Sequence, residues 1–284
     1  MDRRTGPEGF NVERALRQAR ATLAAAGDDE AEAAAERLLM HLLGVERARL
    51  LTHRERPLSL DEQRLFAAVI ARRATGEPVP YITGRQAFRT LDLEVNRDVL
   101  IPRPESELLV DVAIERRSGL AVEVGTGSGA IALAIATESP RLRVVATERS
   151  GPALRVARRN RDRLGLEVAL IQTDLIAGII SPIDVLVANL PYIDRVGLAK
   201  LPTGVREWEP QAALDGGPGG LVLIGALLVS ARRVLAPGGL VVLEIAFDQG
   251  APAAALARRA FPAARVDVLR DLAAHDRVVR ISLK

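Results

Sequence analysis

The sequence predicts an α/β protein in which a small N-terminal helical bundle precedes a doubly wound, mostly parallel sheet. From residue 120 onward, short apolar strands alternate with amphipathic helices, which is typical of a parallel sheet covered on both faces. A glycine-rich segment, residues 125–129, directly follows the first of these strands and opens a helix. Before residue 75, apolar residues recur at three- and four-residue steps, as they do along amphipathic helices.

Three helices are predicted in the first part of the chain. They span residues 12–26, 31–43 and 59–73. Gly27 separates the first two as a stop signal, and Ser59 with Glu62 gives the pattern of a capping box at the start of the third. Helices joined by short turns predict a small bundle. Such a bundle is either a packing or dimerisation module or a substrate-docking domain; we assign the docking role to residues 1–75.

Residues 76–100 are predicted to be a linker with a short β-hairpin, followed by a second domain at residues 101–284. The segment Gly76 to Pro80 breaks the helical pattern and is a candidate hinge. Residues 91–95 alternate apolar and polar side chains, like a half-exposed strand. In the second domain the predicted strands are residues 121–124, 143–147, 168–172, 184–188 and 240–245, with helices such as residues 131–138 and 152–164 between them.

The composition is that of an ordinary globular protein. The 284 residues are 48% hydrophobic and 26% charged, and the absence of cysteine excludes disulfides, thiolate metal sites and cysteine nucleophiles. Residues 1–8 are polar and lack the apolar core of a signal peptide, and no apolar run approaches the roughly 18 residues of a spanning helix. The net charge is only +3. We therefore expect a cytoplasmic protein without a membrane or a stable nucleic-acid partner.

The glycine-rich segment predicts a nucleotide-type loop. Its residues are Gly125, Thr126, Gly127, Ser128 and Gly129. Glycines let the backbone turn tightly and approach a ligand closely. No Lys-Ser/Thr pair follows, so it is not a P-loop, and the dinucleotide fingerprint fits only in part because the last glycine is an extra.

Acidic residues stand beside this loop and at the ends of the next two strands. Glu148 ends the second strand, where an acid can accept hydrogen bonds from a ribose diol. Glu123 precedes the loop and can bind a cationic amine, and Asp174 with Leu175 follows the third strand and can lie beside an adenine. The alternative for each acid is a solvated strand end. Loop, acid and strands together resemble the S-adenosylmethionine-dependent methyltransferase fold; an NAD enzyme would leave residues 189–192 without a role.

The tetrapeptide Asn189-Leu190-Pro191-Tyr192 follows the apolar strand at residues 184–188. The side-chain carbonyl of Asn189 and the backbone carbonyl of Leu190 can each accept one N–H of a planar NH2 group. Pro191 fixes its own φ and stiffens the turn, and Tyr192 offers a flat face. The alternative is an ordinary strand-ending turn with a packed tyrosine.

A second motif gives a specific resemblance. The segment Leu100-Ile101-Pro102-Arg103-Pro104-Glu105-Ser106-Glu107 is similar to the Ile-Pro-Arg-Pro-Glu-Thr-Glu signature of the protein-glutamine N5-methyltransferases that act on peptide-release factors, the PrmC/HemK family. Further similar segments are Glu77 to Gly84, Glu209-Pro210 with Ala213-Leu214, Gly219-Gly220-Leu221, Pro237-Gly238-Gly239 before Leu243-Glu244, and Asp271 to Arg277. The resemblance spans nearly the whole chain and is weakest in the first 75 residues.

This resemblance implies a seven-stranded, Rossmann-like methyltransferase domain that uses S-adenosylmethionine and no metal. The implied reaction is methyl transfer to the glutamine of the Gly-Gly-Gln motif in class I release factors, by a monomer that modulates translation termination. It assigns residues 189–192 to catalysis and substrate binding, with Asn189 also at the cofactor. Arg103 either lines the active site and binds substrate or pairs with Glu105 and Glu107 as a structural clamp.

The chain departs from the family pattern at two positions, and several alternative functions stay open. Leu190 replaces the first proline of Asn-Pro-Pro-Tyr, and Ala274 stands where the family usually has glycine, as a loop detail. Because Asn-Leu-Pro-Tyr also resembles the tetrapeptide of ribosomal-RNA adenine N6-methyltransferases, an RNA or DNA adenine methyltransferase is an alternative. A glutamine methyltransferase of a ribosomal protein and a cofactor-binding scaffold without catalysis are two more. Trp208 either walls the acceptor slot or packs in the core.

Overall fold

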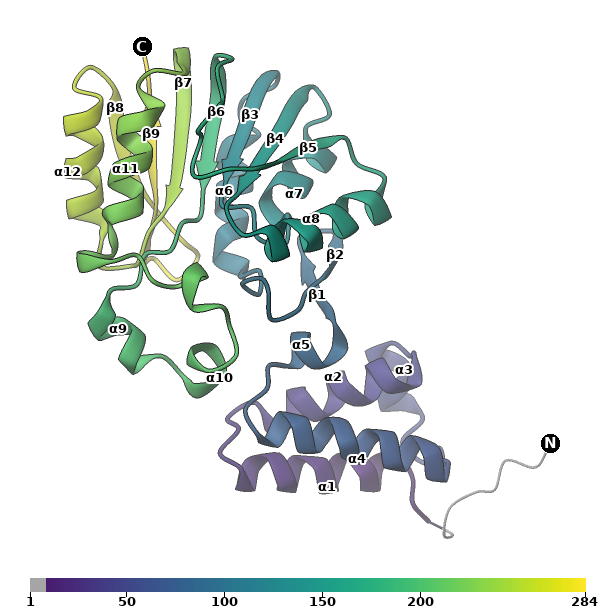
Figure 1. Cartoon of the computed structure of the whole chain (residues 1–284). Helices are drawn as coiled ribbons and strands as arrows, with labels where there is room; N and C mark the ends of the chain where they lie inside the picture. The colour runs from purple at the N-terminus through teal and green to yellow at the C-terminus, as the bar shows by residue number, and fades with distance from the viewer. Residues whose placement is uncertain (1–8) are drawn as a thin grey trace. The chain divides into compact units, whose positions relative to one another are not determined.

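A computed structural model describes residues 9–284, which form two compact units (Figure 1). One unit comprises the chain up to Gly84 together with Thr203–Trp208, and the other comprises Arg85–Pro202 and Glu209–Lys284. The segment 1–8, expected to lack a signal sequence, lies outside the described residues. Within residues 9–284, no helix is both long and apolar enough to cross a membrane. The predicted division at residues 75 and 100 stays a prediction.

The first unit is a bundle of helices, and all three predicted helices are present. Its elements are α1 (Val12–Ala25), α2 (Ala31–Leu43), α3 (Arg47–Thr52), α4 (Leu60–Ala74) and α5 (Val79–Thr83), with α10 (Thr203–Arg206) from the later segment. The prediction that residues 76–80 form only a linker is wrong in one respect, because α5 begins there. Pro78 caps α5, and Pro80 stands in its first turn, where a missing N–H costs nothing.

Local signals set the ends of these helices as expected. The Ser59 side chain accepts from the Glu62 N–H while the Glu62 carboxylate accepts from the Ser59 N–H, which completes the capping box of α4. Gly44 ends α2 with φ of +61°, a conformation that glycine adopts without steric strain. Trp208 belongs to this unit, where its Nε1 lies near Gly76, and it is not among the residues that line the pocket described below.

The second unit contains a seven-stranded, mostly parallel sheet flanked by helices, which confirms the predicted fold class. Its strands are β3 (Gly119–Val124), β4 (Leu142–Glu148), β5 (Val168–Gln172), β6 (Ile183–Ala188), β7 (Leu235–Glu244), β8 (Arg265–Arg270) and β9 (Asp276–Ser282). They are ordered β5-β4-β3-β6-β7-β9-β8; β9 is antiparallel to both β7 and β8, and every other pair is parallel. A separate hairpin, β1 (Arg85–Phe88) with β2 (Leu91–Glu94), precedes the sheet.

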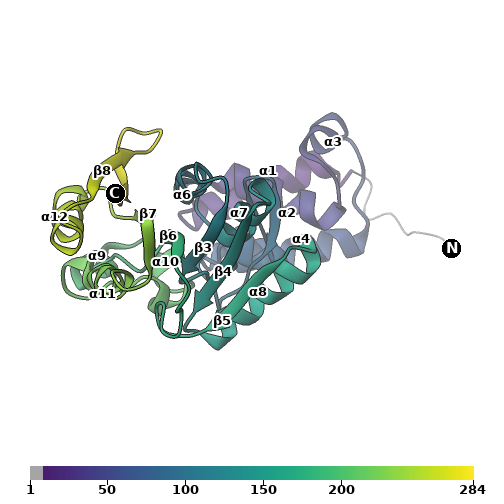
Figure 2. The ribbon, with the colours of Figure 1, turned by 90° about the horizontal axis from the view of Figure 1, so that it is seen from above.

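Helices cover both faces of the sheet (Figure 2). The helices of this unit are α6 (Glu107–Ala113), α7 (Ala130–Glu138), α8 (Gly151–Leu164), α9 (Arg195–Lys200), α11 (Val222–Ala231) and α12 (Gly250–Ala260). Residues of α6 and α7 form one apolar core with one face of the strands, and residues of α11 and α12 form a second core with the other face. Alternate residues of β3 divide between them: Ala121 enters the first core and Val122 the second.

The strand order creates a switch point between β3 and β6. From β3 the chain adds β4 and β5 on one side, and it then returns to place β6 and β7 on the other side. Ligands of open α/β sheets bind outside the carboxyl ends of the strands at such a point. The glycine-rich segment follows β3 and the tetrapeptide follows β6, so both predicted motifs lie at the switch point.

The turn between β8 and β9 contains one departure from the family pattern, Ala274. Ala274 has φ of +63°, and its N–H donates to the Asp271 carbonyl. Left-handed backbone costs a residue with a Cβ about 1–2 kcal/mol, whereas glycine adopts it freely. The substitution is therefore more than a loop detail, because it places strain in this turn.

Candidate active site

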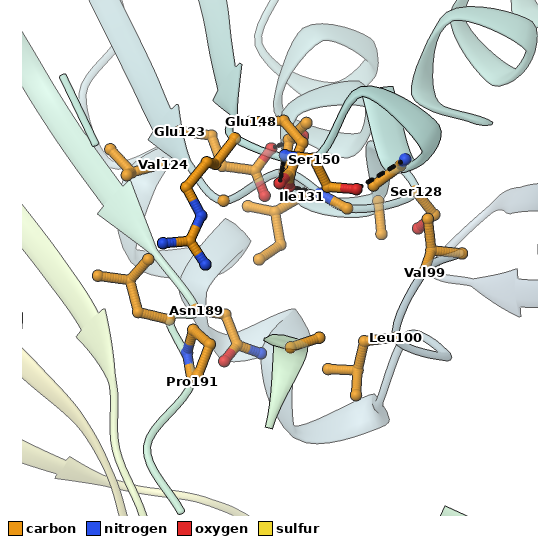
Figure 3. A pocket seen from close by; sticks show the side chains of 18 of the residues that line it. Val99, Leu100, Glu123, Val124, Ser128, Ile131, Glu148, Ser150, Asn189 and Pro191 are labelled. Carbon is orange, nitrogen blue, oxygen red and sulfur yellow. Dashed lines mark hydrogen bonds between the residues drawn. The ribbon is translucent and has the colours of Figure 1, made fainter. Parts of the chain in front are cut away.

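A pocket at the switch point brings together most of the predicted site residues (Figure 3). Glu123, Glu148 and Ser150 lie on one side of it, and Asn189 and Pro191 lie on the opposite side. The predicted residues that line it are Arg103, Glu123, Gly125, Thr126, Gly127, Ser128, Glu148, Asp174, Leu175, Asn189, Leu190 and Pro191. Two predicted residues are not among its lining: Gly129, which caps α7, and Tyr192.

The glycine-rich loop has the geometry that close approach of a ligand requires. Gly125, Gly127 and Gly129 have φ of +76°, +56° and +89°, which residues with a Cβ rarely adopt. The N–H groups of Gly125 and Thr126 both donate to the Thr147 carbonyl, so the loop is fixed to the end of β4. A Cβ on Gly127 would meet no atom within 4 Å, which leaves its backbone open to the pocket. The loop therefore fits a cofactor that packs against main chain.

Asn160 on α8 supports this loop from behind and was not identified from the sequence. Its side chain is fully buried, and its Nδ2 donates to the carbonyls of Ser128 and Glu94, each at 2.9 Å. Its Oδ1 accepts from the Glu94 N–H at 2.7 Å. The Asn160 side-chain amide thus joins the glycine-rich loop to hairpin strand β2, because both of its N–H groups donate and its oxygen accepts.

Glu148 at the end of β4 is held by backbone donors. One carboxylate oxygen accepts from the Gly127 N–H at 3.0 Å, and the other accepts from the Ser150 N–H at 2.8 Å. A carboxylate has about four acceptor positions, so capacity remains for the two hydroxyls of a ribose. The two backbone bonds fix the orientation of the carboxylate, and its contact with a ribose stays a prediction.

Glu123 is a buried acid beneath the loop. Its side chain accepts from the Thr126 hydroxyl and from the Ala132 N–H, and the residue is 2% exposed. Burial raises the pKa of Glu123 to about 7, with the nearby Glu148 charge acting in the same direction. Because the folded protein retains this proton above pH 4.5, the free energy of unfolding falls as the pH rises from about 4.5 to about 7.

We expect S-adenosylmethionine to bind more tightly as Glu123 ionises. A cationic amine near this carboxyl favours the ionised form, so binding below the pKa must first remove a proton. Affinity is therefore expected to rise roughly five- to tenfold between pH 6 and pH 7.5, below the range in which an α-amino group titrates. Calorimetric titrations across this range measure the effect.

Glu123→Gln is the control for this prediction. The glutamine keeps the shape and an acceptor for the Thr126 hydroxyl but does not titrate. Its affinity for S-adenosylmethionine is expected to be nearly flat over the same pH range. Equal pH dependence in the variant and the wild-type protein would show that another group causes it.

Asp174 and Leu175 line the same pocket beyond the end of β5. Leu175 has φ of +48°, an unusual backbone conformation for a residue with a large side chain. Such strain is typical of segments that are held in place for binding. Their position agrees with the predicted contact to an adenine, which stays a prediction.

On the opposite side, Asn189 is oriented by a residue that sequence analysis did not single out. The Asn189 Nδ2 donates to the Ser106 Oγ at 2.9 Å, and Ser106 is 3% exposed. With the NH2 group directed to Ser106, the Oδ1 is the atom left to accept. Neither this oxygen nor the Leu190 carbonyl accepts a hydrogen bond from any residue that the structure describes.

Leu190 packs between the two motifs. Its side chain is 4% exposed and lies in the apolar core with Val124 and Leu243. A Cβ on Gly125 would lie 3.2 Å from Leu190 Cδ2, so the leucine rests against the glycine-rich loop. Packing thus restrains residue 190 where the family has proline, and its carbonyl still follows Asn189 directly.

Tyr192 is placed behind the pocket wall. Its hydroxyl donates to Glu244 Oε1 at 3.3 Å, and burial raises its pKa, so the phenol stays protonated. The Tyr192 carbonyl accepts from Gln249 Nε2 at 2.9 Å. A methyl group on Gly220 would overlap the same carbonyl oxygen. This explains the glycine at position 220, which lets a second loop approach the tetrapeptide backbone.

Arg103 lines the pocket and also forms an ion pair, but not with the expected partners. Its guanidinium pairs with Glu209, whose side chain is 1% exposed, rather than with Glu105 or Glu107. The other Glu209 oxygen accepts from the Ile101 N–H at 3.2 Å. The buried carboxylate therefore joins the motif around Arg103 to the segment before Pro210.

Four polar residues of the site were missed as functional candidates: Ser106, Asn160, Glu209 and Glu244. Ser106, Glu209 and Glu244 stand in segments that resemble the family motifs, and this resemblance could have identified them. Asn160 lies on an amphipathic helix, and only its burial among apolar neighbours distinguishes it.

The comparisons with known proteins agree with this arrangement. A family model described as the methyltransferase small domain matches residues 104–201. The crystal structure of a methyltransferase from Pyrococcus furiosus has the same fold, with a TM-score of 0.54 at 22% identity over 69% of this chain and 90% of that chain. The fold and the pocket together define an S-adenosylmethionine-dependent methyltransferase.

Relatives at higher identity identify the family. The chain is 43% identical over 275 residues to the release factor glutamine methyltransferase of Moorella thermoacetica, covering 94% of this chain and 97% of that protein. It is 40% identical over 271 residues to the protein of the same name from Cereibacter sphaeroides, covering 95% and 97%. A family model described as the PrmC N-terminal domain matches residues 14–84. The chain belongs to the release factor glutamine methyltransferase family.

Proposed function

We propose that this protein transfers a methyl group from S-adenosylmethionine to the side-chain nitrogen N5 of the glutamine in the Gly-Gly-Gln motif of class I peptide-chain release factors. The modification modulates translation termination. Family membership supports this proposal, and so does the separation of the pocket into a donor side and an acceptor side. The donor side carries the glycine-rich loop with Glu123 and Glu148, and the acceptor side carries Asn189 and Leu190.

Residues of the donor side would hold the cofactor. S-adenosylmethionine, when bound, supplies a methyl group on a sulfonium ion, which is a strong electrophile. We assign the amine to Glu123, the ribose hydroxyls to Glu148, and the adenine to the wall around Asp174 and Leu175. The backbone of Gly127 would lie open to the cofactor, since no side chain intervenes.

The acceptor side addresses the low reactivity of an amide nitrogen. The lone pair of an amide nitrogen is delocalised into the carbonyl group, so the nitrogen is a poor nucleophile. The Asn189 Oδ1 and the Leu190 carbonyl each accept one N–H of the substrate amide. These two bonds favour a more pyramidal nitrogen and direct its lone pair toward the donor side, so the site acts by orientation and electrostatic preorganisation. The methylated amide then loses a proton to water, and no strong base is required.

The orientation of the Asn189 amide is the observation that carries this assignment. Because Nδ2 donates to Ser106, the pocket is presented with an acceptor and not with a donor. Mass spectrometry of the Gly-Gly-Gln peptide after incubation of a release factor with enzyme and S-adenosylmethionine tests it. We expect one added methyl group on the glutamine, and none on a release factor with alanine at that position. Methyl label in RNA but not in this peptide would contradict the proposal and favour an adenine methyltransferase.

We further propose that the protein acts as a monomer in the cytoplasm, where it meets release factors without a stable nucleic-acid partner. The small net charge of +3 supports the last point. We also propose that the helical unit binds the release factor outside the Gly-Gly-Gln loop. Hydrogen exchange of the full chain is then expected to slow in α1 to α5 when release factor is added, and unchanged exchange there would contradict this role.

A further inference from the structure

A buried glutamine lies behind the acceptor tetrapeptide. Gln249 follows the turn after β7 and directly precedes α12, and it is 9% exposed. Its main chain is fixed on both sides, because its N–H donates to the Ala246 carbonyl and its own carbonyl accepts from the Ala253 N–H, each at 2.9 Å. The turn and the helix thus fix the position from which its side chain extends.

The side-chain amide of Gln249 contacts three segments. Its Nε2 donates to the Tyr192 carbonyl at 2.9 Å and to the Gly219 carbonyl at 3.3 Å. Its Oε1 accepts from the Ala246 N–H at 3.0 Å. Rotation of the amide by half a turn would set its oxygen against two carbonyl oxygens, so these contacts allow one orientation. One side chain therefore joins the tetrapeptide to the loop at residues 215–221 and to the turn after β7.

The hydrogen bond to Tyr192 fixes the peptide group that directly follows the tetrapeptide. The Tyr192 carbonyl and the Ile193 N–H belong to one planar peptide group. Gln249 donates to this carbonyl, and the Ile193 N–H donates to the Leu214 carbonyl at 3.1 Å. The plane is thus held at both edges, while strand β6 holds the chain directly before the tetrapeptide. The four residues of the acceptor site therefore span a short interval between two fixed points.

The loop at residues 215–221 lies directly against the tetrapeptide backbone. A Cβ on Gly216 would lie 2.6 Å from the Pro191 carbonyl oxygen, and a Cβ on Gly220 would overlap the Tyr192 carbonyl oxygen. Main chain therefore meets main chain along this contact. Because Gln249 binds one carbonyl group from each of the two segments, it holds them together.

We propose that Gln249 is a positioning residue for methyl transfer: by binding the Tyr192 carbonyl it fixes the backbone that presents the Leu190 carbonyl to the substrate amide. The inference rests on the proposed function, because only a substrate that donates N–H bonds needs this acceptor held. Pro191 has a fixed φ, so a displacement at Tyr192 is carried on to Leu190. Gln249 is not among the residues that line the pocket, so its effect is expected in the rate of transfer and not in cofactor binding.

Gln249→Glu in the full-length enzyme tests the proposal, because pH controls its hydrogen-bond donor. The neutral carboxyl group has the shape of the amide and one O–H for the Tyr192 carbonyl, whereas the carboxylate has no donor and repels that oxygen. Burial raises the pKa of the introduced group, as do the nearby acids Glu244 and Asp276, and Arg277 opposes them. At saturating S-adenosylmethionine and release factor, the ratio of variant to wild-type kcat is therefore expected to fall about 10- to 100-fold between about pH 5.5 and about pH 8.

Gln249→Met separates the rate of transfer from binding. Methionine keeps the length of the side chain but removes the amide donor and acceptor. Both kcat and kcat/KM are expected to fall equally, by about 10- to 100-fold at every pH, as for an interaction that acts on the transition state. The Kd for S-adenosylmethionine, measured by calorimetry, is expected to change far less. A role confined to stability would instead lower the folded fraction, measured by circular dichroism, and leave the rate per folded enzyme unchanged.

Gln86→Glu is the matched control. Gln86 in β1 donates from Nε2 to the Ala87 carbonyl at 3.0 Å, and it is not among the residues that line the pocket. The same substitution there removes a comparable hydrogen bond and is expected to leave kcat unchanged at every pH. An equal pH trend in this variant would show that the trend does not depend on position 249, and it would overturn the role of Gln249.

The outcomes distinguish this inference from the function on which it rests. A wild-type enzyme that methylates no glutamine would overturn the proposed function and this inference with it. An active wild-type enzyme with a flat kcat ratio for Gln249→Glu, or a wild-type kcat in folded Gln249→Met, would overturn only the role of Gln249. If Gln249→Met does not fold, the pH dependence of Gln249→Glu decides.

Discussion

Asn189→Ala is expected to lower kcat for glutamine methylation by on the order of 10²- to 10³-fold, because one of the two acceptors that orient the substrate nitrogen is lost. Binding of S-adenosylmethionine is expected to weaken by less than about tenfold, since at most one hydrogen bond to the cofactor side is affected. Steady-state rates with labelled methyl donor give the first quantity, and calorimetry gives the second.

Asn96→Ala is the matched control for this prediction. The Asn96 side chain accepts from the Asp98 N–H at 2.9 Å in the turn before the Arg103 motif, and Asn96 is not among the residues that line the pocket. Its replacement is expected to change stability by about 0.5 kcal/mol or less and to leave kcat unaltered. Undiminished methyl transfer by Asn189→Ala would refute the assignment of the acceptor site.

Gly220→Ala is expected to destabilise the protein by about 3–5 kcal/mol, the range of severe steric substitutions. Gly220 has φ of +71°, and a methyl group there would overlap the Tyr192 carbonyl oxygen and the Gln249 Nε2. Both are held by the hydrogen bond that joins them, so neither can move away cheaply. Urea denaturation measures the free energy of unfolding. The folded variant is also expected to have a lower kcat, because the added methyl group displaces the tetrapeptide.

The neighbouring Gly219 provides the comparison. It has φ of +64°, but a Cβ there would meet no atom within 4 Å. Gly219→Ala is therefore expected to lower the free energy of unfolding by about 1–2 kcal/mol, which is the cost of placing alanine in the left-handed backbone region. Equal losses of stability in the two variants would show that the contact with Tyr192 is not the cause.

The sequence predicted the elements that carry strong local signals. Apolar runs predicted β3 to β7, and caps such as Ser59 predicted helices of the first unit. It predicted neither of the last two strands, β8 and β9. The residues of β8 are half-buried or exposed throughout, so no face of that strand stands out as buried, whereas β9 has a buried core that was overlooked. It also missed α5, because Pro78 and Pro80 were interpreted as helix breakers although both stand at a helix start, where proline is tolerated.

The loops of the candidate site were predictable, but the contacts that orient them were not. Glycines after β3 and an asparagine after β6 indicate where ligands bind in a parallel sheet. By contrast, the Arg103–Glu209 pair joins residues 106 positions apart, and the Asn189–Ser106 bond joins residues 83 positions apart. Only the folded chain brings such groups together, and nearer acids at Glu105 and Glu107 were the plausible but wrong partners for Arg103.

The contact between Leu190 and Gly125 has a consequence for the geometry of the reaction. In the proposed function one loop serves the methyl donor and the other serves the acceptor nitrogen, and an aliphatic side chain of the second rests on a glycine of the first. Closely packed interiors have low compressibility and transmit small displacements. The separation of the two loops therefore depends on the volume of the side chain at position 190, and a larger or smaller residue there is expected to change this separation, and with it the path of the methyl group in the proposed reaction, without altering any reacting group.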